Sequence, residues 1–381
     1  QWEKGVDGLL SALVARAEDP HTQYLNRDSW RQLNERQSNA GFVGIGAHVG
    51  PDPAGVKIAR PLPGSSSAAA ELRQNGKVVA TGLKKDDVII TIDRVSAAGM
   101  ALDEAVQRLR GVAGTTVEIR VRRGAQEYDA VVTRKHVSTP NSFSRMAAPG
   151  IGYVYFAAFI KDTDLDVFSH IDRLKAQGAS KLIIDVRGNP GGSLPVVQSI
   201  ASEFLRDKQD ITTTRTQGII IERAFVDGDG MYKDLPVAVL IDTGSASARE
   251  ILAAVLKDHA RAKIVGWQSY GKGTFQRVIP PEIPVEVVGV VIGRKLDGTG
   301  VKVTGGGWFS PSGQSINGQH DPATGRNKPG TGGVVPHVSV SVSDSEQEAV
   351  MNGITEQLYK TGPSAAYDPA LGAAVTLLNQ P

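Results

Sequence analysis

The sequence predicts an α/β protein with a layered core and a smaller strand-rich module inserted near its N-terminus. From about residue 150 onward, apolar strands and helices alternate, which is typical of a layered α/β domain. Residues 41–137 instead contain short strands and one clear helix, the size of a compact interaction module. The 381 residues, 40% of them hydrophobic, are enough for two or three domains. We therefore expect a helical segment over 1–40, the module over 41–137 and the core over 138–381.

Composition excludes several classes of protein. Lys and Arg total 42 against 40 Asp and Glu, a net charge of +2, and no long basic run occurs, so we expect no nucleic-acid binding. Cysteine is absent, which excludes disulfides, a thiol nucleophile and cysteinyl metal sites. No apolar run reaches the roughly 18 residues of a membrane helix. No His-Glu-x-x-His pattern or carboxylate cluster with ligand spacing occurs, so we expect neither a metal nor a cofactor.

The first two segments can be divided further. Apolar residues over 6–14 recur at helical spacing, and Asp19-Pro20 ends that helix before a polar stretch. In the module, residues 102–109 predict a helix with acidic residues in its first turn. Strands are expected at 42–47, 56–58, 88–92, 116–121 and 128–132.

The core shows a regular alternation. Strands are expected at 152–157, 182–186, 237–241 and 263–265, and helices at 165–177, 194–205 and 248–256. The stretch 280–335 is rich in Gly and Pro and predicts long loops between short strands. Two terminal helices are expected at 346–359, with Asp344 and Ser345 as candidate caps, and at 370–378.

The segment 242–251 is the most informative for chemistry, because it joins a buried strand to a helix. A serine at such a turn, Ser247, projects its hydroxyl from the sheet edge, and the small residues around it let a peptide backbone approach. The helix N-terminus adds a partial positive field near a developing anion. The alternative is that Ser247 only caps the helix.

A nucleophilic serine needs a base. None of the seven histidines lies in a familiar triad pattern, and His259 lies at the far end of the helix, roughly 18 Å away. Lys272 lies between two glycines and becomes a base when burial lowers its pKa. Gln276 could orient its amine. The alternative for Lys272 is a solvated loop residue.

A second strand-to-helix loop, 185–192, ends in the pair Gly191-Gly192. Paired glycines free backbone N–H groups to face a ligand, which suits an oxyanion hole. The alternative is an ordinary Asn-Pro-Gly-Gly turn.

Together these segments resemble the carboxyl-terminal processing peptidases, or tail-specific proteases, which are serine proteases with a Ser–Lys pair. The resemblance covers most of the chain. It is carried by Asp-Pro-His-Thr-x-Tyr-Leu at 19–25, Gly-Ile-Gly-Ala at 44–47, the turns at 82–89 and 109–115, Asp-x-Arg-x-Asn-Pro-Gly-Gly at 185–192, Gly-Ser-Ala-Ser-Ala-x-Glu at 244–250, Lys-Asp at 257–258, Arg-Ala at 261–262, Gly-Lys-Gly-x-x-Gln at 271–276, and the loops at 311–313 and 333–336.

The resemblance implies specific roles. Ser247 corresponds to the family nucleophile, and Lys272, 25 residues later, to its base. Gln276 corresponds to the family glutamine, and the oxyanion donors would be the N–H of Ala248 and one from Gly191-Gly192. The resemblance also implies a crotonase-like core with an inserted PDZ domain.

The chain departs from the family pattern at several places. Arg249 replaces a serine beside the expected oxyanion hole and either faces solvent or screens the site. Asp86 replaces a glycine at a position where we expect a left-handed backbone. Residues 279–298 look longer than the family link, and His337 stands where the family has Asp. None of these changes touches Ser247, Lys272 or Gln276.

The resemblance implies an endopeptidase whose partners are peptides and proteins with free C-termini. The PDZ module would hold the terminal carboxylate on the loop Gly44-Ile45-Gly46, although these glycines could simply shape a strand bend. The alternatives are an inactive PDZ scaffold and, ranked last, acyl-CoA chemistry. We expect an extracytoplasmic location, periplasmic, secreted or anchored through a missing N-terminal segment.

Overall fold

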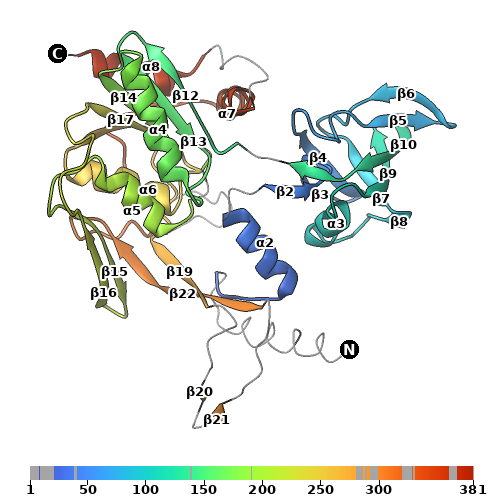
Figure 1. The fold of residues 1–381 in the computed structure, drawn as a ribbon, viewed down its shortest axis with the longest axis horizontal. Coiled ribbons are helices and arrows are strands. Elements are labelled where there is room, and N and C mark those ends of the chain that lie inside the picture. The colour runs from blue at the N-terminus through green and yellow to red at the C-terminus, as the bar shows by residue number, and fades with distance from the viewer. Residues whose placement is uncertain are drawn as a thin grey trace. The chain divides into compact units, whose positions relative to one another are not determined.

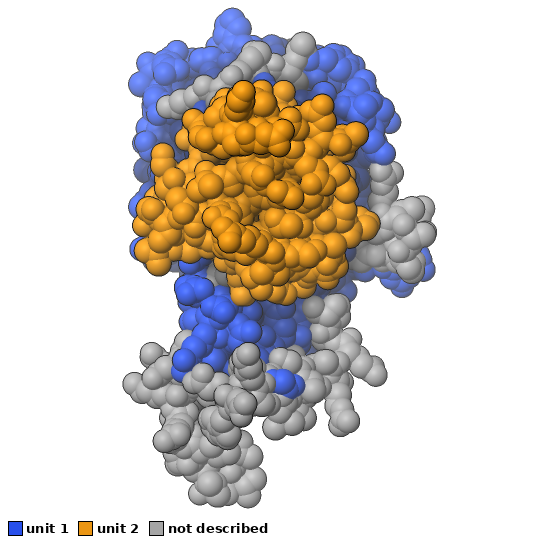
Figure 2. All heavy atoms as spheres, turned by 90° about the vertical axis from the view of Figure 1, so that its right-hand side faces the viewer, with its two compact units in different colours: residues 1–39, 140–381 blue, residues 40–139 orange. Residues whose placement is uncertain are grey.

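The computed structural model divides the chain into two compact units, Ala40–Thr139 and a core made of Gln1–Asn39 with Pro140–Pro381 (Figure 2). It describes residues 8, 21–37, 41–137, 140–189, 191–279, 286–287, 290–291, 299–319, 328, 331–359 and 367–380. The sequence analysis placed the module at 41–137. The helix predicted over 6–14 lies outside the described residues apart from Gly8, which is helical.

The smaller unit is a strand-rich fold around one helix, α3 (Leu102–Leu109). Its main sheet has the order β3-β4-β7-β9-β10-β5-β6, with β8 on β7, and β2 pairs separately with β11. Alternating residues of β9 and β10, together with Ala105 and Leu109 of α3, form its core. The strands are β2 (Phe42–Gly44), β3 (Ala47–Asp52), β4 (Gly55–Pro61), β5 (Glu71–Gln74), β6 (Lys77–Thr81), β7 (Val88–Ile92), β8 (Val95–Ser96), β9 (Thr116–Arg123), β10 (Gln126–Thr133) and β11 (Lys135–Val137).

The predictions for this unit hold where the apolar pattern is strong. The bounds of β7 and α3 match the sequence prediction. Asp86 has φ 69°, so its position is left-handed as expected. The β5–β6 hairpin was not predicted, because most of its side chains are exposed and carry little apolar periodicity.

The core unit is built on a six-stranded sheet of order β12-β13-β14-β17-β18-β23. Figure 1 labels its strands β12, β13, β14 and β17. All its pairs are parallel except β12–β13. Two of its inner strands, β13 and β17, are buried at every position, because both faces of the sheet are covered. The strands are β12 (Ser142–Ala148), β13 (Ile151–Phe156), β14 (Lys181–Asp185), β17 (Val237–Ile241), β18 (Ala262–Gly266) and β23 (Val338–Ser339).

Helices pack on both faces of this sheet, giving three layers. Val154 and Phe156 of β13 face the cluster containing α4, α5 and α6, whereas Tyr153 and Tyr155 face the cluster containing α7 and α8. This division follows from the alternation of side chains along a strand. The helices are α4 (Thr163–Ala176), α5 (Leu194–Ser202), α6 (Ala248–Asp258), α7 (Asp344–Leu358) and α8 (Pro369–Asn379).

A second sheet corrects the prediction of loops over 280–335. The ten-residue strand β22 (Gly300–Phe309) includes Gly305-Gly306-Gly307 and pairs with β1 (Gln23–Leu25), β15 (Asp210–Thr216) and β19 (Thr274–Ile279). β16 (Ile219–Phe225) extends β15. A Cβ on Gly306 would lie 2.1 Å from the Arg215 carbonyl oxygen, so close backbone approach explains glycine in this strand. Residues 286–287 and 290–291 form the short pair β20–β21 (Glu286–Val287 and Val290–Val291).

The remaining differences concern helix ends. Helix α2 (Arg27–Gln37) lies in the stretch predicted only as polar. Ser343, rather than Asp344 or Ser345, caps α7, since its hydroxyl accepts the Glu346 N–H at 3.3 Å. Among the described residues, no helix is long and apolar enough to cross a membrane.

Candidate active site

Two strand-to-helix loops lie side by side at one edge of the central sheet. β14 and β17 are parallel neighbours, with Asp185 opposite Leu240, so the loops that follow them leave the sheet at the same edge. The first loop contains Gly191 and Gly192, and the second contains Ser247. The fold therefore brings together two segments that lie more than 50 residues apart in the sequence.

Ser247 lies in a strained turn directly before α6. Its φ of 63° and ψ of −124° form a backbone conformation that residues with a side chain rarely adopt. Such a turn between a strand and a helix is typical of nucleophilic residues. Ala248 is the first residue of α6, so its N–H has no acceptor within the helix. The side chain of Ser247 is half-buried.

The glycine pair lies against this turn. A Cβ placed on Gly191 would be 2.9 Å from the Ser247 Cβ and 3.3 Å from the Ala248 nitrogen. The Gly191 N–H donates to Asn189 Oδ1 at 2.8 Å, whereas no described residue accepts from the Gly192 N–H.

Glu250 links the Ser247 turn to the Lys272 loop. Its side chain is fully buried, and Oε2 accepts the N–H of Ser247 at 2.8 Å and of Lys272 at 2.9 Å. Oε1 accepts the Ser269 hydroxyl at 2.5 Å and the Gly271 N–H at 2.6 Å. Burial raises the pKa of Glu250, and the hydrogen bonds act in the opposite direction. The sequence analysis did not identify this role, although an acid three residues after Ser247 is a capping-box signal.

Lys272 lies in the loop directly before β19, and Gln276 lies within that strand. The Lys272 carbonyl accepts the indole N–H of buried Trp308 at 3.2 Å, which fixes the loop against β22. The backbone nitrogens of Lys272 and Ser247 both donate to Glu250 Oε2. The distance between these two nitrogens is therefore at most the sum of the two hydrogen-bond lengths. Gln276 lies in β19, and its amide donates to Thr274 Oγ1 at 3.4 Å.

A cavity of about 660 Å³ opens beside Ser247 and Gln276. Gly192 and Ala248 also line it, while Lys272 and Gly191 lie outside its lining. Its walls combine apolar side chains with both signs of charge. The apolar ones include Phe159, Leu194, Val196, Ile251 and Trp308, and the charged ones are Lys161, Asp162, Glu222, Arg277 and Lys302. A peptide segment fits a cavity of this size.

The structure corrects both expectations for Arg249, because its side chain neither faces solvent nor lines the cavity beside Ser247. Its side chain is only 2% exposed. It donates to the Val186 carbonyl at 2.9 Å and to the Gly244 carbonyl, and its Nη1 lies 3.7 Å from Asp242 Oδ1. Burial lowers the pKa of Arg249 to about 10, with Asp242 and Glu250 opposing, so the guanidinium is charged at neutral pH.

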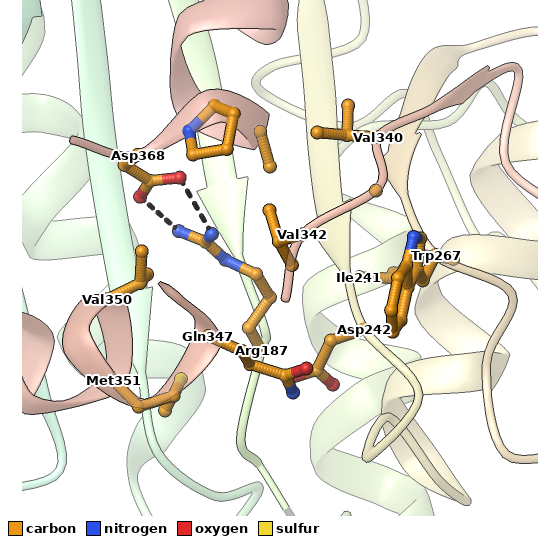
Figure 3. A pocket seen from close by; sticks show the side chains of 13 residues that line it. Arg187, Ile241, Asp242, Trp267, Val340, Val342, Gln347, Val350, Met351 and Asp368 are labelled. Atoms are coloured by element: carbon orange, nitrogen blue, oxygen red, sulfur yellow. Dashed lines mark hydrogen bonds and ion pairs between the residues drawn. The ribbon is translucent and has the colours of Figure 1, made fainter. Parts of the chain in front are cut away.

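Arg187 holds the glycine loop from the other face of the sheet. It pairs with Asp185 at 2.6 Å and, through two hydrogen bonds of 2.8 and 2.9 Å, with Asp368 before α8 (Figure 3). A small cavity of about 30 Å³, lined also by Asp242, Gln347 and Met351, lies beside this pair. It is large enough for a water molecule and not for a peptide.

The predicted tail-binding loop lies in the smaller unit. Ile45 is buried, and the Gly46 carbonyl accepts the Leu62 N–H and the hydroxyls of Ser65 and Ser67. Gly46 has φ 76°. These contacts anchor the loop by its carbonyls. β3, which follows the loop, lies at one edge of its sheet.

These features define a candidate site with a serine at a strained strand-to-helix turn of an α/β core, in a chain that also carries a separate strand-rich unit. The comparison with known proteins agrees. The model of peptidase family S41 matches residues 150–340, and that of the PDZ domain matches residues 32–122. The chain belongs to peptidase family S41.

Two curated relatives illustrate the similarity. A protein of Staphylococcus haemolyticus named "probable CtpA-like serine protease" is 27% identical over 368 residues, which are 96% of this chain and 64% of that protein. The carboxy-terminal processing protease CtpB of Bacillus subtilis is 30% identical over 321 residues, 83% of this chain and 61% of that protein. The chain thus spans a little under two thirds of the length of these relatives.

Solved structures show the same fold. The photosystem II D1 C-terminal processing protease matches with a TM-score of 0.55 and 25% identity, covering 95% of this chain and 88% of that one. An S41 family protein from Bacteroides fragilis matches with a TM-score of 0.53 and 12% identity, covering 98% and 89%. These likenesses establish an α/β S41 fold with a PDZ domain.

Proposed function

We propose that this protein is a serine endopeptidase that processes the C-terminal region of proteins and peptides. The observation that carries the proposal is the convergence of three segments around Ser247. Gly191 packs against it, Glu250 joins its backbone to that of Lys272, and a peptide-sized cavity opens beside it. Membership of the S41 family supports the same reaction.

In the proposed mechanism, Ser247 Oγ attacks the peptide carbonyl carbon while the neutral amine of Lys272 takes its proton. The negative charge that develops on the carbonyl oxygen is stabilised by the N–H groups of Ala248 and Gly192. The Lys272 ammonium then protonates the departing amine, leaving an acyl-enzyme that water hydrolyses. Gln276 orients the lysine amine. The N-terminus of α6 adds a favourable field.

The smaller unit supplies recognition in this proposal. β3 is an edge strand and can add an extended peptide as a further strand, with the terminal carboxylate on the loop Gly44-Ile45-Gly46. We also propose a crotonase-like topology for the core. The parallel run β13-β14-β17-β18 with helices on both faces supports this assignment.

The decisive experiment incubates wild type, Ser247→Ala and Lys272→Ala with an unfolded protein and identifies the cut sites by mass spectrometry. We expect wild type to cleave, and both variants to lose several orders of magnitude in turnover. Cleavage by Ser247→Ala at the wild-type rate would refute the assignment. A C-terminally amidated peptide should be cut with lower kcat/KM than the free acid; equal cleavage would remove tail recognition alone.

The alternative of an inactive PDZ scaffold is less favoured, because Ser247, Lys272 and Gln276 are all retained. An extracytoplasmic location remains a prediction, which cell fractionation tests.

A further inference from the structure

The buried guanidinium of Arg249 takes no part in the proposed proton transfer. It is the second residue of α6, where the helix dipole disfavours a cation. A buried charge is also costly unless it is paired and hydrogen-bonded. Its contacts must therefore outweigh two unfavourable effects, and they indicate what the side chain does.

Those contacts join the two loops of the site. One end of the guanidinium donates to the carbonyl of Val186, which begins the loop leading to Gly192. The other end donates to the carbonyl of Gly244, in the turn leading to Ala248. The planar, forked guanidinium is suited to bonding two acceptors at a fixed separation, which a lysine amine is not.

Asp242, the ion-pair partner of Arg249, makes the same connection. Its Oδ2 accepts the Gly188 N–H of the glycine loop at 3.1 Å, and its Oδ1 accepts the Ser245 hydroxyl at 2.9 Å. Arg249 and Asp242 thus form one buried unit that contacts both loops. A Cβ on Gly191 would be only 2.9 Å from the Ser247 Cβ, so the two loops are packed too closely to move nearer to each other.

We propose that Arg249 is a positioning residue that sets the separation of the two oxyanion donors, the N–H groups of Ala248 and Gly192. This inference rests on the proposed peptidase function. The oxyanion forms only as the reaction proceeds, so displaced donors should lower kcat and leave KM nearly unchanged. A misplacement of about 1 Å should cost about 10- to 100-fold in kcat.

The test uses the full chain with Arg249→Met, which keeps an unbranched side chain but loses the charge and both hydrogen bonds, and Arg249→Lys, which keeps the charge and a donor but not the fork that spans two carbonyls. Arg261→Met is the matched control. Arg261 also donates to two carbonyls, those of Tyr232 and Leu235, but near the far end of α6. For each variant, kcat and KM on a peptide, the inhibition constant of a matching peptide boronic acid and the thermal midpoint are measured.

We expect Arg249→Met to lose about 10- to 100-fold in kcat, with KM within about threefold, and Arg249→Lys to fall between it and wild type. The boronic acid forms a tetrahedral adduct with Ser247, so its inhibition constant should rise by the same factor. Arg261→Met should lower only the thermal midpoint. Unchanged kcat in both Arg249 variants, or a loss confined to KM, overturns the inference. An inactive wild type instead overturns the proposed function and the inference with it.

Discussion

Replacement of Asp368 by Asn should destabilise the core unit, and it changes none of the residues of the proposed mechanism. Asp368 is 11% exposed and makes two charge-assisted hydrogen bonds to Arg187. Arg187 also forms an ion pair with Asp185, which the substitution leaves in place. Asn keeps one acceptor oxygen and remains a good cap for α8, so the substitution removes one such bond and one buried charge. A hydrogen bond to a charged group contributes about 1.5–3 kcal/mol. We expect the free energy of unfolding to fall by about 2–3 kcal/mol. This is less than the roughly 3–5 kcal/mol that is lost when a buried ion is left without any partner.

The assay is urea unfolding followed by tryptophan fluorescence. Trp30, Trp267 and Trp308 belong to the core unit and residues 40–139 contain no tryptophan, so the signal does not report the smaller unit. The control is Asp234→Asn, which removes a charge from a pair with Arg206 of similar length, 2.6 Å, whose side chains are 59% and 68% exposed. Such a surface pair contributes about 1 kcal/mol or less. Equal losses in the two variants would refute the reasoning.

The effect should also depend on pH. Burial alone would raise the pKa of Asp368, but the hydrogen bonds and charge of Arg187 outweigh it, so the net pKa lies below its usual value. The stabilisation is therefore present above the unfolded pKa of about 3.9 and is lost as pH falls through the lower folded value. The difference between wild type and Asp368→Asn should shrink below about pH 4. A difference that grew on acidification would contradict this assignment.

Three further predictions concern the site. Glu250→Gln replaces one carboxylate oxygen, which accepts two donors, by an NH₂ group that can accept neither, so we expect a lower thermal midpoint and at least about tenfold lower kcat; a fully active variant would contradict the linking role. Gly191→Ala places a Cβ 2.9 Å from that of Ser247 at φ +98°, and should reduce kcat by about 100-fold or more in a peptide assay. A lysine base acts only as the neutral amine, so kcat/KM should rise from neutral into alkaline pH; a flat profile between about pH 6 and 10 would exclude Lys272 as the base.

Sequence patterns predicted the elements whose side chains repeat with a clear period. The bounds of β7, β17 and α3 follow from local apolar spacing, since a buried strand or a helix face imposes that spacing on its own residues. β22 was missed because its glycines read as loop residues. Whether a glycine lies in a strand depends on what approaches it, and here the backbone of β15 does.

The sequence by itself predicted the residue types of the candidate site, because Ser247, Lys272 and the Gly191-Gly192 pair lie in short motifs at strand ends. Only the tertiary structure decided how these motifs are held together. Glu250 reaches the Lys272 amide 22 residues away, and Arg249 reaches the Val186 carbonyl 63 residues away. Such contacts leave no local pattern, since a carboxylate or guanidinium finds its buried partners only after the parallel strands have brought distant loops to one edge. For the same reason, Arg249 is buried, although it was expected at the surface or over the site.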